Sequence, residues 1–181
     1  MYLELLMVFI VGCSMQSANN MADMYTKPQI ILHWIVVVLI ASQYLFKHEI
    51  AAAWATIRSG EDFSFHPLIL LHVVGGSLIL IFMIWRLVLR GLHGVPATPN
   101  NDQFLLSIIS RIVHGAFYVV IILMSLSGLA AWFGDIILAA QVHNVLKVVL
   151  LALIAMHVLA VPFHHFVLKD RIMRRMIKSR N

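Results

Sequence analysis

Residues 136–163 read IILAAQVHNVLKVVLLALIAMHVLAVPF, and this stretch decides the fold class. It is longer than the roughly 20 apolar residues that a helix needs to cross a bilayer. Because the hydrocarbon core offers no water to the backbone, such a stretch must be helical there. The stretch also carries His143 and His157. Histidine is costly in lipid unless it is paired or ligated, so the presence of these two residues indicates a functional role.

Three more apolar stretches precede this one, at residues 30–46, 67–89 and 112–133. The 181-residue chain is 61% hydrophobic and 12% charged, whereas a soluble domain is about 25% charged. This composition excludes a disordered chain, a collagen-like chain and a basic nucleic-acid-binding domain. The connections are short or moderate, so neighbouring helices should be antiparallel. We predict an all-α integral membrane protein, a bundle of four transmembrane helices.

The basic residues predict the orientation of this bundle. Ten of the 13 lysines and arginines fall before the first stretch, around the second connection or after the fourth stretch. They are Lys27, Arg86, Arg90, Arg111, Lys169, Arg171, Arg174, Arg175, Lys178 and Arg180. Cytoplasmic loops carry an excess of such residues, so both termini should be cytoplasmic.

The chain reads as one domain with two short additions. We expect an N-terminal extension at residues 1–24, a transmembrane domain at 25–176 and a basic tail at 177–181. Residues 5–13 resemble the core of a signal peptide, but no basic residue precedes them, so a non-essential extension or an over-long start is the preferred explanation. The single cysteine, Cys13, excludes an intramolecular disulfide, a cysteine zinc site and an iron–sulfur cluster. Metal chemistry here would use the ten histidines.

His143 and His157 are 14 residues apart on one helix. At about 100° per residue they return to within roughly 40° of one direction, so they share a face. At about 1.5 Å per residue they are ~21 Å apart along the axis. Two ligands at opposite depths of one face suit two cofactors stacked across the bilayer.

Each of these histidines has a partner at its own depth on another helix. His72 is level with His143 near the outer side, and His33 is level with His157 near the inner side. Two neutral imidazoles supply strong axial ligands to haem iron without a bare charge in lipid. The pattern predicts two bis-histidine haems, with His114 as an alternative inner ligand to His33.

Other residues fit around such haems. Arg86, 14 residues after His72, could reach the propionates of the inner haem, and Lys147, one turn after His143, those of the outer haem. Interfacial anchoring is the alternative for Arg86. Gly75 and Gly76 would let a flat macrocycle approach the backbone, or would serve close helix packing.

Several segments together resemble the bacterial cytochrome b561 family, which is related to the b-type cytochrome subunits of membrane hydrogenases. They are YTKPQIILHW at residues 25–34, HVVGG at 72–76, WRLVLR at 85–90, and HHFVLKD at 164–170 following His143 and His157. The resemblance covers residues 25–176. It implies a four-helix bundle in the bacterial inner membrane with two haems b, whose iron ligands pair His33 with His157 and His72 with His143.

The resemblance also implies that ubiquinone is a partner, with His164, Lys27 and Tyr25 at its site. Some members resemble superoxide oxidases, in which superoxide outside gives electrons and ubiquinone accepts them. The sequence departs from those members at Met24, where a basic residue is expected. The main hypothesis is therefore a quinone-linked oxidoreductase with a periplasmic donor. The alternatives are an anchoring cytochrome b subunit of a periplasmic dehydrogenase or hydrogenase and, more remotely, histidine-based metal transport.

Overall fold

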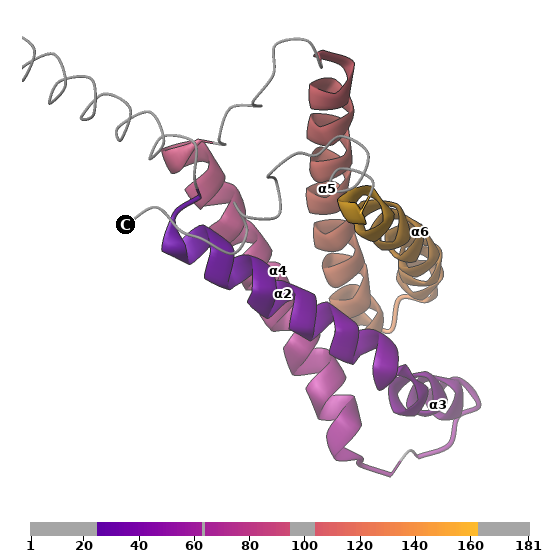
Figure 1. Ribbon diagram of the computed structural model, residues 1–181. Helices are drawn as coiled ribbons and strands as arrows, with labels where there is room; N and C mark the ends of the chain where they lie inside the picture. Colours follow the sequence, from indigo (N-terminus) through magenta and orange to yellow (C-terminus); the bar gives the residue numbers. More distant parts are fainter. Residues whose placement is uncertain (1–24, 63, 95–103, 163–181) are drawn as a thin grey trace, which may run out of the picture.

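The computed structural model describes residues 25–62, 64–94 and 104–162, and this part of the chain is helical (Figure 1). Its helices are α2 (Lys27–Leu45), α3 (Lys47–Arg58), α4 (Pro67–His93), α5 (Phe104–Gly134) and α6 (Ile137–Pro162). The predicted extension at residues 1–24 and the basic tail lie outside the described residues.

Four of these helices are long and apolar enough to span a membrane, namely α2, α4, α6 and the part of α5 from Ile108 to Gly134. Large apolar side chains point outward along them, as at Val38, Val119 and Leu159, which are 57–69% exposed. An apolar exterior is costly in water but suits a chain surrounded by lipid. The prediction of an all-helical protein with four spans is confirmed. Which side each terminus faces stays a prediction.

Capping hydrogen bonds and prolines mark the first turns of α2 and α4. At the start of α2, the Thr26 backbone N–H donates to Oε1 of Gln29 (3.0 Å), and Pro28 occupies the first turn. This pairing satisfies an N–H group that the helix itself leaves unbonded. Helix α4 begins at Pro67, and the residue before it, His66, accepts a hydrogen bond at Nδ1 from the Leu68 N–H (3.2 Å). The sequence placed three helix starts correctly within a few residues, whereas α5 begins eight residues before the expected position.

Helix α3 was not predicted from the sequence. It occupies the first connection, and among its residues only Ala53 is buried. At its C-terminal end, Arg58 forms an ion pair with Asp135 in the turn between α5 and α6, with a distance of 3.2 Å. Both side chains are largely exposed, so the pair is worth about 0–1 kcal/mol. The contact places α3 beside the end of the bundle at which α5 turns into α6.

Consecutive long helices pack together. Helix α2 lies along α4, α4 contacts α5, and α5 packs on α6 after a turn of two residues (Figure 1). A hydrogen bond from the Tyr44 hydroxyl to the backbone carbonyl of Lys147 (2.6 Å) links α2 to α6. The four long helices thus form an antiparallel bundle with its first and last helices in contact.

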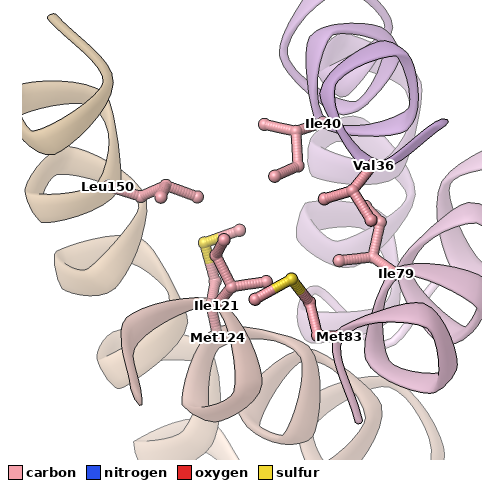
Figure 2. Packing of buried hydrophobic residues seen from close by; sticks show 7 residues of the cluster. All are labelled: Val36, Ile40, Ile79, Met83, Ile121, Met124 and Leu150. Carbon is pink, nitrogen blue, oxygen red and sulfur yellow. The ribbon is translucent and has the colours of Figure 1, made fainter. Parts of the chain in front are cut away.

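Buried apolar side chains from all four long helices meet at half depth, and we call them the central apolar layer (Figure 2). Its members are Val36, Ile40, Ile79, Met83, Ile121, Met124 and Leu150. Leu150 is fully buried and stands seven residues from both His143 and His157. The layer therefore separates the two histidine levels that the sequence predicted.

Candidate functional site: two histidine clusters

We name the two clusters after the sides predicted from the basic residues, and the outer cluster contains His72 of α4 and His143 of α6. Both are half-buried, and they lie close enough to interact electrostatically. Nδ1 of His143 is 2.8 Å from the backbone carbonyl oxygen of Met124 in α5. Because a carbonyl oxygen only accepts hydrogen bonds, Nδ1 carries the proton and donates it. The other ring nitrogen, Nε2, then has its lone pair free for a metal.

His72 lacks a comparable anchor. Its Nδ1 atom is buried and has no hydrogen-bond partner among the residues that the structure describes. Buried polar atoms are nearly always satisfied, so an orphaned imidazole nitrogen marks an incomplete polar site. Two half-buried imidazoles within apolar surroundings are the donor set that a low-spin haem iron uses, and the residues of the outer cluster fit that group.

Lys147 lies beside the outer cluster, as the sequence predicted. It interacts electrostatically with both His72 and His143. Its ammonium group donates to Oδ1 of Asn144, 2.9 Å away, in the preceding turn of α6. The side chain is therefore held near the two imidazoles and keeps further donors for an anionic group.

The inner cluster contains three histidines, His33 of α2, His114 of α5 and His157 of α6. The rings of His114 and His157 meet edge to face with centroids 5.6 Å apart. His33 interacts electrostatically with both. Nδ1 of His114 donates to the carbonyl oxygen of Ser110 (2.6 Å), one turn back in the same helix. The structure thus brings together His33 and His157 as expected, and it keeps His114 as the alternative inner ligand.

Arg86 stands at the inner level. It interacts electrostatically with His33 and His114. Within residues 25–62, 64–94 and 104–162, the one salt bridge joins Arg58 and Asp135, so Arg86 has no carboxylate partner there. Its guanidinium keeps its donors for an anion such as a haem propionate, the role predicted from its spacing to His72.

The predicted quinone residues are only partly placed. Lys27 is exposed at the first residue of α2, directly after Tyr25 and Thr26. The Gln29 amide reaches the carbonyl oxygens of Leu89 (3.5 Å) and Gly94 (3.3 Å) at the end of α4, which fixes this corner of the bundle. His164 lies outside the described residues.

Gly128, Gly75 and Gln43 make contacts at or near the outer cluster, and of these the sequence analysis considered only Gly75. A Cβ at Gly128 of α5 would stand 3.0 Å from the ring of His143. A Cβ at Gly75 would collide with the side-chain amide of Gln43 in α2, while Gly76 has open space around it. Gly75 therefore serves close helix packing, which was one of its two interpretations. A polar residue within an apolar stretch was the only available signal for Gln43.

The described residues contain no group of three or more histidine, cysteine or acidic side chains that could hold a bare metal ion. A haem needs fewer protein ligands, because the porphyrin supplies four nitrogens and the protein two. Two imidazoles at a level are therefore enough to hold a haem.

Comparison with known proteins agrees with this geometry. The family described as prokaryotic cytochrome b561 matches residues 24–179. Cytochrome b562 of Cereibacter sphaeroides is 30% identical over 161 residues, covering 86% of this chain and 96% of that protein. A protein of Yersinia pestis named probable superoxide oxidase CybB is 26% identical over 180 residues, covering 86% of this chain and 97% of that protein. The chain therefore belongs to the prokaryotic cytochrome b561 family and is a multi-pass membrane cytochrome, for which the family implies haem b.

Proposed function

We propose that this protein is a dihaem cytochrome that passes electrons across the inner membrane, from a donor on the outer side to ubiquinone. The observation that carries the proposal is the division of half-buried histidines into an outer and an inner cluster, separated by the central apolar layer. One haem would be held by His72 and His143 and the other by His33 and His157. Each haem, when bound, supplies an iron that exchanges one electron.

The chain's own residues prepare these positions. The Met124 carbonyl fixes the ring of His143 so that Nε2 is the ligating atom. Lys147 and Arg86 donate to propionates at the outer and inner levels, respectively. At the inner side, His164, Lys27 and Tyr25 bind ubiquinone, and His164 donates a hydrogen bond to a quinone carbonyl and relays a proton.

Superoxide is the donor that we favour, because a relative is named probable superoxide oxidase CybB. In the balanced reaction, two superoxide anions each lose one electron and become O2. One ubiquinone takes up these two electrons and two protons and becomes ubiquinol. Lys147, beside the outer histidines, gives an anionic donor a local point of attraction.

The deciding experiment is a reduced-minus-oxidised spectrum with haem quantification on the purified protein. We expect a split b-type α-band and two haems per chain. His143→Ala and His157→Ala should each remove one haem, and retention of both haems in either variant would contradict the ligand assignment.

The donor is tested separately by giving superoxide and a short-chain ubiquinone to the isolated protein. Ubiquinol formation above the rate without protein supports the superoxide reaction. Stoichiometric co-purification with a soluble enzyme, together with no superoxide-driven reduction, would instead identify an anchoring subunit of a periplasmic dehydrogenase or hydrogenase.

A further inference from the structure

Gln43 is a buried polar side chain in a span of otherwise apolar buried residues. It is 8% exposed, and its neighbours on the buried face of α2 are Val36 and Ile40. Its Oε1 atom has no hydrogen-bond partner among the described residues. An amide oxygen buried without a partner costs about 1–3 kcal/mol, so such an atom usually has a partner or a function.

The structure makes room for this amide. Gly75 of α4 lies directly against Nε2 of Gln43, and a Cβ on Gly75 would stand 3.5 Å from the Cδ atom and would overlap Nε2. Any residue larger than glycine at position 75 would displace the amide. The glycine and the glutamine therefore form one packing unit between α2 and α4.

His72 lies close to this packing unit along α4. It precedes Gly75 by three residues, so the two share one face of α4 and are about 4.5 Å apart along its axis. Nδ1 of His72 is the second buried polar side-chain atom in the described residues without a partner. The amide of Gln43 thus packs against the residue one helical turn after His72, and each of the two side chains has one buried atom without a partner among the described residues.

The two outer histidines differ in this respect. His143 has a backbone carbonyl, that of Met124, to accept its Nδ1 proton. A ligating histidine almost always donates its other ring N–H to such an acceptor, which fixes the tautomer and raises the basicity of the ligating nitrogen. Within the part of the chain that the structure describes, Nδ1 of His72 has no such acceptor, whereas the side-chain amide of Gln43 packs against Gly75, one turn further along α4.

We propose that Gln43 is a positioning residue for His72, whose Nδ1–H donates to Oε1 of Gln43 when the outer haem is bound. This proposal rests on the proposed role of His72 as an axial ligand. Rotation of the Gln43 amide would exchange Nε2 and Oε1 and would place the acceptor against Gly75, one turn after His72. The bond would orient the imidazole and strengthen its donation to the ferric iron.

The test compares Gln43→Met, which keeps the volume and removes the acceptor, with Gln43→Glu, which keeps an acceptor oxygen. The matched control is Gln141→Met, at an exposed position two residues before His143. Each variant is purified with its haems, and the outer haem is followed by haem content, electron paramagnetic resonance and redox titration.

For Gln43→Met we expect a higher midpoint potential of the outer haem, an altered low-spin resonance and about a tenfold loss of haem affinity at that site. Gln43→Glu should hold the outer haem as the native protein does, and Gln141→Met should change nothing. An outer haem with unchanged potential and resonance in Gln43→Met would overturn the proposal. So would equal effects of Gln43→Met and Gln43→Glu, because those would indicate packing alone.

Gly75→Ala provides an independent variant, because it displaces the amide without altering it. We expect it to reproduce the potential shift of Gln43→Met in the native background and to add nothing to Gln43→Met. Full additivity of the two substitutions would contradict the proposal. If the native protein holds no haem at the outer level, the proposed function itself fails. If it holds that haem and none of these substitutions affects it, only the role of Gln43 fails.

Discussion

Gly128 of α5 lies against the imidazole of His143 in α6, so that a Cβ at position 128 would stand 3.0 Å from both Cε1 and Nδ1 of the ring. Nδ1 is also the atom that donates to the Met124 carbonyl oxygen, 2.8 Å away. The backbone of Gly128 thus packs against the imidazole. The carbonyl oxygen of Met124, one turn earlier in α5, accepts the hydrogen bond from its Nδ1 atom. Helix α5 therefore fixes the position of a histidine that it does not contain.

Gly128→Ala should therefore weaken the outer haem site. The added methyl group forces the ring to shift by a few tenths of an ångström, which disturbs its bond to Met124, and loss of such a support typically costs about tenfold in affinity. Haem titration of the apoprotein measures the change. Gly115→Ala, in the same helix but with no atom within 4 Å of the added Cβ, is the control. Equal losses in the two variants would show that the effect is not specific to His143.

The choice between the inner histidines is tested by single substitutions. We expect His33→Ala to remove the inner haem, and His114→Ala to retain it, because the depth of His33 matches that of His157. Haem quantification per chain should fall from two to one for His33→Ala only. The opposite result would make His114 the ligand, an arrangement that its ring contact with His157 also allows.

Leu150→Ala should destabilise the bundle. Leu150 is fully buried in the central apolar layer, and truncating such a leucine leaves a cavity worth about 2–5 kcal/mol. Leu151→Ala changes a neighbouring side chain that is 53% exposed and faces outward, so we expect a smaller loss. Thermal unfolding in detergent compares the two variants. Similar losses would indicate that the layer is not closely packed.

Lys147→Gln should lower the midpoint potential of the outer haem. A positive charge near the iron disfavours the more positive ferric state, so its removal favours oxidation. The shift should shrink as ionic strength rises, because salt screens an accessible charge. Lys47→Gln, at an exposed position in the first turn of α3, is the control. Redox titration at two salt concentrations measures both variants, and an unchanged potential in Lys147→Gln would exclude this electrostatic role.

Much of the fold could be predicted because the membrane restricts the possible structures. A long apolar stretch in lipid must be helical, because its backbone groups have no water to bond to, and the four spans follow from this rule. Helix α3 could not be predicted in the same way, since its residues are of mixed polarity and hydropathy does not identify a short interfacial helix. The early start of α5 was missed because a search for the span itself stops at Arg111.

For the candidate site, the sequence predicted the depth of each histidine along its helix but not the side-chain contacts around it. Counting residues along helices indicated that His72 would lie near His143 and His33 near His157, and these side chains are electrostatic neighbours. Their roles as iron ligands stay predictions. The contacts of Gln43 and Gly128 depend on which helix faces pack together, and a single sequence does not contain that information.

The central apolar layer has a consequence for charge movement. Its seven buried members are all apolar, so none of their side chains can relay a proton between the two levels. An electron can tunnel through such a barrier, and it would then cross the electric field of the membrane without a proton relayed by these side chains. Moving one charge through 100 mV involves about 2.3 kcal/mol. Transfer between the two histidine clusters would therefore be electrogenic, and its rate would respond to the membrane voltage.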